Sequence, residues 1–180
     1  MSSESGRGSA PTTDPTDTAS LTAADFEWAA YSRSKSALPE LDDVAFFAGL
    51  NLVRAAASLV QVSEERVHRP LGWSWAGFRV MYIIWILGEA EARSISRLAG
   101  VTRQTTSSVL ATLERDGLVA RTRSMIDRRL VGVTLTERGE EGVRTALNAQ
   151  NRLTAERLGG LDRQELEQLG ALLRKALLHD

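Results

Sequence analysis

Apolar residues recur every three or four positions over most of the chain, which predicts a mainly helical protein. The longest such stripe lies between Leu41 and about Val67. It comprises Val44, Ala48, Leu52, Ala55, Leu59 and Val62. Residues 74–88 carry apolar side chains on nearly every face, so we expect a central helix that Ser74 caps and Gly88 ends. Within that helix we expect Trp85 to be fully buried.

The first forty residues divide into two parts. Residues 1–24 include 14 Ser, Thr, Pro or Gly residues, which predicts a disordered tail. Thr22 and Asp25 have the spacing of a capping box, so residues 25–40 are expected to form an N-terminal extension with a short helix that ends before Pro39. The tail does not resemble a secretory signal, and we expect a cytoplasmic protein.

A helix-turn-helix is predicted in the middle of the chain. A short helix over residues 94–99 is followed by Gly100, which permits a tight turn, and Thr102 then caps a second helix that ends at Gly117. The inner stripe of the second helix comprises Thr106, Val109, Leu110 and Leu113. Two short helices joined by so few residues are typical of a helix-turn-helix.

A β-hairpin and two further helices are predicted after this motif. Leu118–Arg123 and Leu130–Leu135 have the pattern of strands, with residues 124–129 as the loop between them. Thr136 can cap a long helix that continues to Leu158. Two glycines interrupt the pattern there, and a last helix begins near Asp162.

Composition excludes several classes of function. The chain has no cysteine, which removes disulfides and thiolate metal sites. Its two histidines, His68 and His179, lie in different predicted elements without a phosphate loop or metal-ligand spacing, so we expect no enzyme, cofactor or metal. The most apolar uninterrupted run, Val80–Leu87, is far shorter than the roughly 20 residues of a membrane helix, so no membrane partner is expected.

Positive charge is concentrated on the helix-turn-helix and the hairpin. The whole chain has a net charge of −1, whereas residues 97–131 contain seven arginines against three acidic residues, which is a net charge of +4. Such a segment favours neutralisation of nucleic-acid phosphates. The outward face of the second helix carries polar or small residues, namely Gln104, Ser107, Ser108, Ala111 and Arg115, which suits a DNA major groove, although any solvent-facing helix side is polar. Gln104 is the best candidate for contact with base edges.

The hairpin loop contains Asp127, Arg128 and Arg129. An arginine held at a hairpin tip can enter a narrow minor groove, and a nearby carboxylate can hold it in place. The alternative is an exposed ion pair between Asp127 and Arg129 that contributes about 0–1 kcal/mol to stability.

Three stretches resemble the MarR family of winged helix-turn-helix regulators. They are residues 94–102 (SISRLAGVT), 113–119 (LERDGLV) and 127–139 (DRRLVGVTLTERG), and the resemblance extends from Leu41 to His179. It implies that Asp127 and Arg129 form the Asp-x-Arg motif of the wing, and that the start of the second helix contacts bases. Ser108 departs from the family pattern, in which an arginine or another long polar residue is frequent. The expected DNA-contact set is Arg103, Gln104, Thr105, Ser107, Ser108, Arg115, Arg121, Arg123, Asp127, Arg128 and Arg129.

The fold class that follows is mainly α with a small β-wing. Residues 69–136 would form the winged helix-turn-helix domain, and residues 41–68 and 137–180 the flanking dimerisation helices. The resemblance implies a homodimer that binds double-stranded DNA at an inverted repeat, although the apolar stripes could instead fill the core of one chain.

The resemblance also implies a repressor that small aromatic or phenolic effectors release. His68, Trp73, Trp75 and Tyr82 could line an effector pocket, although core packing explains most of these residues better. The alternative function is a winged-helix module that binds another protein and no DNA.

Overall fold

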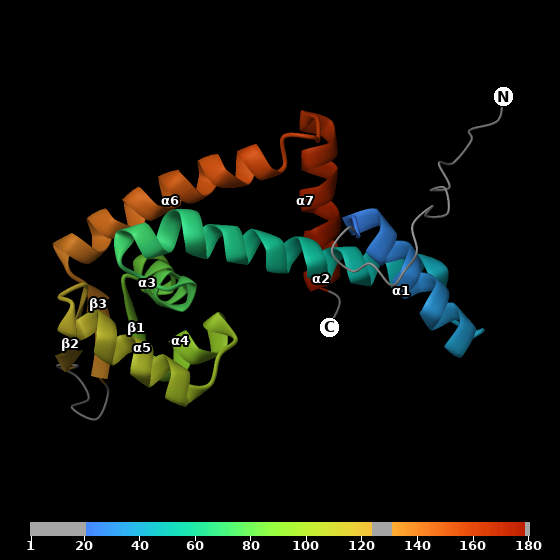
Figure 1. Cartoon of the computed structure of the whole chain (residues 1–180). Helices are drawn as coiled ribbons and strands as arrows, with labels where there is room; N and C mark the ends of the chain where they lie inside the picture. The colour runs from blue at the N-terminus through green and yellow to red at the C-terminus, as the bar shows by residue number, and fades with distance from the viewer. Residues whose placement is uncertain (1–20, 124–130, 179–180) are drawn as a thin grey trace. The chain divides into compact units, whose positions relative to one another are not determined.

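The computed structural model describes residues 21–123 and 131–178, and the chain divides after Ser58 into two compact units (Figure 1). Residues 1–20 of the predicted tail lie outside the described residues. In the first unit, α1 (Ala23–Ala37) begins with the expected capping box between Thr22 and Asp25. It packs on the start of α2 (Asp43–Ser63) through aromatic rings, with 4.8 Å between the ring centroids of Tyr31 and Phe47. The Lys35 ammonium lies 2.8 Å from the Asp43 carboxylate and joins the two helices further.

The second unit begins in the last turn of α2 and contains the remaining elements. They are η1, a π-helical turn (Glu64–His68), η2, a 3-10 turn (Arg69–Leu71), α3 (Trp75–Leu87), β1 (Glu89–Glu91), α4 (Ala92–Ala99), α5 (Arg103–Arg115), β2 (Val119–Arg123), β3 (Val131–Leu135), α6 (Glu137–Arg157) and α7 (Arg163–Leu177). Ser74, Thr102 and Thr136 each cap a helix with the side-chain oxygen, as the sequence predicts, and Asp162 caps α7, which begins where the sequence predicts a last helix.

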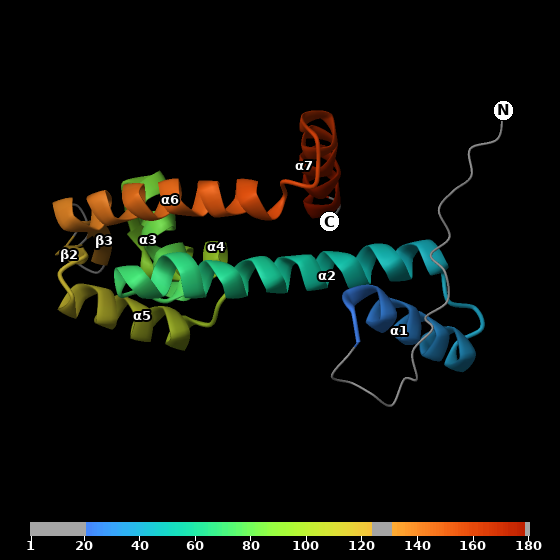
Figure 2. The same ribbon diagram turned by 45° about the horizontal axis from the view of Figure 1, so that its top comes forward.

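The core of the second unit is centred on α3. Figures 1 and 2 show α3 between α6 on one side and the α4–α5 pair on the other. Met81, Ile84 and Ile95 are completely buried there, which confirms the predicted central helix. The expectation for Trp85 is wrong, because its side chain is 40% exposed. In the last turn of α3, Ile86 and Leu87 are exposed as well, whereas Ile84 is completely buried.

The sheet has three strands, one more than the sequence predicts. The order is β1-β3-β2 with both pairs antiparallel, and Ala90 of β1 is opposite Val133 of β3. A strand of three residues is too short to show an alternating pattern, and glutamate is a poor strand former. This short strand connects α3 to α4, so the hairpin is paired to the start of the helix-turn-helix.

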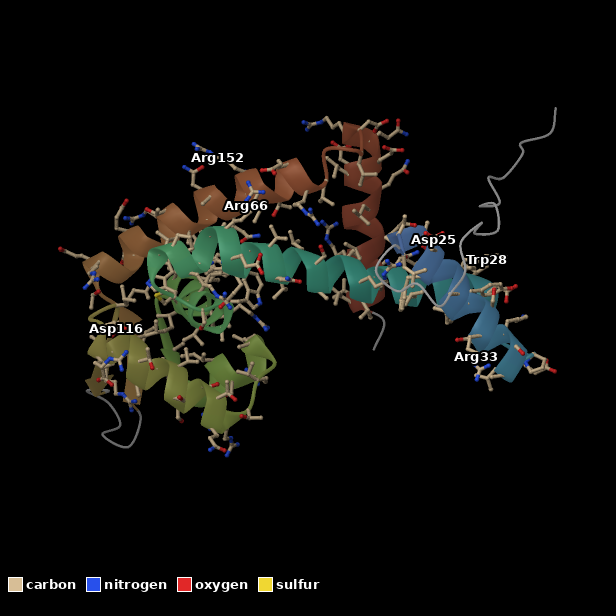
Figure 3. All side chains as sticks on the ribbon, viewed as in Figure 1. Asp25, Trp28, Arg33, Arg66, Asp116 and Arg152 are labelled. Carbon is tan, nitrogen blue, oxygen red and sulfur yellow. The ribbon has the colours of Figure 1, made fainter. Side chains whose placement is uncertain are left out.

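The end of α2 is joined to α6 by polar contacts. The Arg66 guanidinium donates to both carboxylate oxygens of Glu156, at 2.8 and 2.9 Å (Figure 3). The Gln150 amide donates to the hydroxyl of buried Ser63 at 2.9 Å. These contacts hold α6 against the turn that precedes α3.

The helical stretch Asp43–Leu71 is longer and more apolar than the longest uninterrupted apolar run in the sequence indicates. By length and composition alone it is able to cross a membrane, with a mean hydropathy of 1.4 over 18 residues, and none of that window is buried. The mean hydropathy stays high although the window contains Arg54 and several small residues. A count of consecutive apolar residues, in contrast, is interrupted by each of them. One such helix is by itself weak evidence for a membrane span.

Candidate nucleic-acid interface

The turn between α4 and α5 is held by hydroxyl groups. Thr102 caps α5 by accepting the Thr105 amide at 3.1 Å, and Gly100 adopts a left-handed conformation with φ 62° at the end of α4. Inside the turn, the Ser96 hydroxyl donates to the fully buried Thr106 hydroxyl at 2.8 Å. Thr106 in turn donates to the carbonyl of Thr102 at 3.1 Å. The first turn of α5 is therefore fixed to α4.

The two faces of α5 differ as the apolar stripe predicts. Thr106, Leu110 and Leu113 are buried in the second unit. The opposite face is exposed and carries the predicted residues Arg103, Gln104, Thr105, Ser107, Ser108, Ala111 and Arg115. This face is polar, and most of its side chains are short, so it can enter a groove about 12 Å wide without steric conflict.

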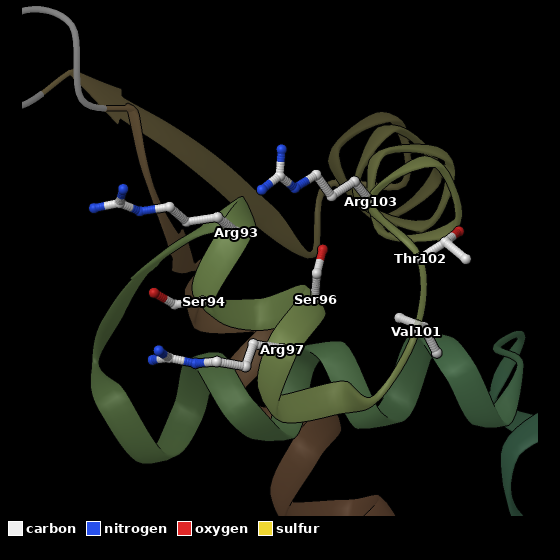
Figure 4. A pocket seen from close by; sticks show the side chains of 7 residues that line it. All are labelled: Arg93, Ser94, Ser96, Arg97, Val101, Thr102 and Arg103. Carbon is white, nitrogen blue, oxygen red and sulfur yellow. The ribbon is translucent and has the colours of Figure 1, made fainter.

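A polar hollow of about 620 Å³ lies between α4 and the start of α5 (Figure 4). This α4–α5 hollow is lined by Arg93, Ser94, Ser96, Arg97, Val101, Thr102 and Arg103. Figure 4 shows the guanidinium groups of Arg93, Arg97 and Arg103 directed to the same side of the motif. Arg93 is paired with Glu91 at 2.6 Å, whereas Arg97 and Arg103 have neither an ion pair nor a side-chain hydrogen bond within residues 21–123 and 131–178. Such arginines can bind a phosphate.

Arg93, Ser94 and Arg97 line this hollow but are absent from the DNA-contact set that the sequence predicts, although Arg97 lies in the positively charged segment. Arg93 and Arg97 are four residues apart and therefore lie on one face of α4. That spacing was visible in the sequence. The orientation of this face toward Arg103 depends on the packing of α4 on α5.

The predicted arginines at the other end of α5 are paired with carboxylates. Arg121 of β2 donates to Glu114 at 2.9 Å, and Arg115 to Asp116 at 3.0 Å (Figure 3). The Asp116 carboxylate raises the pKa of the Arg115 guanidinium through this hydrogen bond. Both arginines therefore contribute less positive potential than the unpaired Arg97 and Arg103.

The wing loop lies outside the described residues. Asp127, Arg128 and Arg129 belong to residues 124–130, and Arg123 is described only by its backbone in β2, opposite Val131. Their assignment to DNA contact therefore stays a prediction. The strands that carry the loop are present where the sequence predicts them.

The four predicted pocket residues come together where η1, α3 and α6 meet. His68 is completely buried and stacks on Phe78 with 4.5 Å between ring centroids. Trp75 and Tyr82 lie on either side of this pair, and Trp73 packs against Gly142, where a Cβ atom would lie 2.6 Å from the indole ring. Both ring nitrogens of His68 and the side-chain oxygen of Gln150 are buried without a hydrogen bond of ordinary geometry among the described residues. The Gln150 side chain favours protonation of the imidazole against the effect of burial. The cluster is thus well packed, with unused polar atoms inside it.

The burial of His68 predicts a loss of stability at acidic pH. Burial lowers the pKa of the imidazole below its ordinary value of about 6.5, so below that pH the unfolded chain binds a proton that the folded protein does not. The stabilising contribution of neutral His68 is full above that pH and is lost as the pH falls toward the lower pKa of the folded state. We expect His68→Phe to reduce the difference in unfolding free energy between pH 7.5 and pH 5.5 in urea titrations. His179→Gln removes the other histidine as the control, and an equal pH dependence in wild type and His68→Phe would refute this prediction.

Among the described residues, no group of three or more histidine or carboxylate side chains is placed to hold a metal ion.

Comparison with known proteins agrees with this geometry. The MarR family model matches residues 73–131, which include the helix-turn-helix and β2 and end at the first residue of β3. The HTH-type transcriptional regulator YwaE of Bacillus subtilis is 32% identical over 125 residues, which cover 69% of this chain and 73% of YwaE.

Two solved structures have the same fold. The regulator BpsR of Bordetella bronchiseptica, whose DNA binding is regulated by 6-hydroxynicotinic acid, has a TM-score of 0.64 and 26% identity and covers 72% of this chain and 97% of its own. A mutant of MarR from E. coli in complex with operator DNA has a TM-score of 0.66 and 22% identity and covers 79% of this chain and 96% of its own. At that identity, the comparison with the MarR mutant supports the fold alone.

Proposed function

Because this chain belongs to the MarR family of transcriptional regulators, we propose that it is a homodimeric, cytoplasmic repressor that binds an inverted-repeat operator and is released by an aromatic or phenolic effector. The observation that carries the DNA-binding assignment is the exposed polar face of α5 next to the arginines of the α4–α5 hollow. In this arrangement, a helix face that fits the major groove lies next to arginines that can bind a phosphate.

The contacts with DNA divide into three kinds. The exposed start of α5 enters the major groove, where Gln104 contacts base edges and the short Ser107 and Ser108 allow close approach. Arg97 and Arg103 each bind a backbone phosphate and fix the position of α5. The wing arginines, with Arg129 oriented by Asp127, enter the neighbouring minor groove.

The exposed apolar residues of α7 support a dimer. The helix has no buried residue in the single chain, and Leu172 and Leu177 are 65% and 78% exposed. Leucines in such number on one short helix are unfavourable in water unless another surface covers them. A second copy of the chain supplies that surface and also accounts for the exposed apolar residues of α2, so no membrane is required.

The dimer assignment predicts the effect of charge on α7. We expect Leu172→Glu combined with Leu177→Glu to convert the dimer to monomer in light scattering, because each carboxylate would be buried in an apolar contact. Gln168→Glu adds a charge to the same helix without removing a leucine and is expected to leave the dimer intact. A dimer that survives both leucine substitutions would place the contact between copies elsewhere.

The effector site is proposed at the aromatic cluster of His68, Trp73, Trp75 and Tyr82. Aromatic walls with unused polar atoms suit a planar ligand that carries a hydroxyl or carboxylate group, which is the chemistry of the compound that regulates BpsR. The cluster is closed in this structure, so the ligand must bind an arrangement in which α3 and α6 have separated. An effector shifts DNA binding only through a difference in affinity between the two arrangements.

The experiment that tests this function is selection of bound duplexes from random DNA, followed by a fluorescence anisotropy titration with a selected duplex. We expect an inverted repeat with half-site centres about 10 base pairs apart, or a multiple of that. A screen of phenolic and aromatic carboxylate compounds for release of the duplex tests the effector. Failure to bind mixed DNA even at low ionic strength would contradict DNA recognition and favour a protein partner for the same surface.

A further inference from the structure

The outer face of the sheet carries a side-chain contact that crosses all three strands. Glu89 of β1 is opposite Thr134 of β3, and Gly132 of β3 lies between Glu91 of β1 and Thr122 of β2. The Thr122 hydroxyl donates to a carboxylate oxygen of Glu89 at 3.2 Å. The side chain of Glu89 therefore passes over β3 and reaches the strand on its far side.

Gly132 provides the space for this crossing. A Cβ atom at position 132 would lie 1.7 Å from Glu89 Oε1 and 2.5 Å from its Cδ, so no other residue fits while Glu89 keeps this position. Gly132 is buried although it belongs to the outer face of a sheet, because the Glu89 side chain covers it. The two residues thus depend on each other.

The second glutamate of β1 connects the same strand to the α4–α5 hollow. Glu91 is two residues after Glu89 and points to the same face of the strand. Its carboxylate holds the Arg93 guanidinium at 2.6 Å. One short strand therefore contacts the base of the hairpin through Glu89 and a residue of the proposed phosphate site through Glu91.

We propose that Glu89 is a positioning residue for DNA binding. Its carboxylate, seated on Gly132 and held by Thr122, fixes the β2–β3 hairpin in relation to α4 and α5. The hairpin and α5 then reach one duplex together, without a rearrangement that would cost binding energy. The inference rests on the proposed function, and Glu89 itself does not touch DNA.

A double-mutant cycle tests the proposal with a duplex recovered from random DNA as the probe. Gly132→Ala is expected to weaken binding roughly tenfold, because the new methyl group displaces the Glu89 carboxylate. Glu89→Ala removes the contact and is expected to weaken binding by a smaller factor. Gly132→Ala combined with Glu89→Ala is expected to equal Glu89→Ala, because the steric conflict is gone.

Glu89→Gln tests whether DNA binding depends on the position of the Glu89 side chain or on its negative charge. Glutamine keeps the side-chain length and the acceptor for the Thr122 hydroxyl, so we expect binding at least as tight as that of wild type. If the carboxylate acted only by repelling phosphate, Glu89→Ala would tighten binding as much as Glu89→Gln, and the proposal would be overturned.

Two further measurements distinguish a positioning role from general loss of structure. Thermal unfolding midpoints report stability, whereas the slope of log K against log salt reports the number of phosphate contacts. We expect the slope to decrease in Gly132→Ala and to recover when Glu89→Ala is added. An unchanged slope, or additive effects in the cycle, overturns the inference while leaving the proposed function intact. If wild type binds no duplex, the proposed function fails, and the inference fails with it.

Discussion

Replacement of Arg97 and Arg103 by alanine together is expected to abolish most of the affinity for DNA and to leave the fold and the dimer unchanged. Neither guanidinium has an intramolecular partner among the described residues, so their removal leaves no buried charge behind. Each arginine that neutralises a phosphate releases a counterion, and near 0.1 M salt this is worth somewhat less than tenfold in affinity. The pair is therefore worth roughly 50- to 100-fold for each protomer on DNA.

The salt dependence of the binding constant shows whether the lost affinity comes from lost phosphate contacts. The slope of log K against log salt is expected to decrease by about two for each bound protomer, because two phosphate contacts are lost. Arg33→Ala combined with Arg152→Ala is the matched control, because both arginines are exposed and, like Arg97 and Arg103, have no ion pair among the described residues, so the same charge is removed elsewhere (Figure 3). An equal loss of affinity in the control pair would show that net charge matters and that the α4–α5 hollow does not.

Gln104→Ala is expected to change which sequences are bound more than how tightly they are bound. The side chain is exposed in the first turn of α5, and a glutamine amide pairs with adenine through two hydrogen bonds. Loss of those bonds relaxes the preference at one base pair in each half-site by about 1–3 kcal/mol, which competition titrations with single-base variants of a selected duplex measure.

Gln104→Glu provides the second test of the same contact. A carboxylate only accepts hydrogen bonds, so the preferred base is expected to change from adenine toward cytosine, whose amino group donates. Ser108→Ala, one helical turn further along the same face, is expected to leave that position unchanged. If all three variants select the wild-type sequence, Gln104 does not contact bases.

Local signals accounted for most of the fold. Thr22, Ser74, Thr102 and Thr136 all cap helices as predicted, because a cap depends on a few consecutive residues. The buried stripe of α5 was also correct, since the helical period alone determines which residues share a face. The same helical repeat predicts which residues of α5 are exposed in the candidate site.

Features that depend on distant residues were not predictable. The strand β1 exists because it pairs with β3 more than forty residues later, and its own sequence does not indicate a strand. Trp85 has apolar neighbours in sequence but few neighbours in space, which no pattern within one helix reports. The ion pair of Arg121 with Glu114 arises because β2 returns along the end of α5. The pattern of charges along the sequence therefore overestimated how many arginines are free for DNA.

The buried hydroxyl pair of Ser96 and Thr106 has a consequence for regulation. It joins the two helices of the motif at their crossing, where a change in angle would break a hydrogen bond that no solvent molecule can replace. We therefore expect the two helices of the motif to keep their crossing angle. In the proposed dimer, an effector would act by tilting or separating the two helix-turn-helix motifs, and the shape that each motif presents to the bases would stay constant.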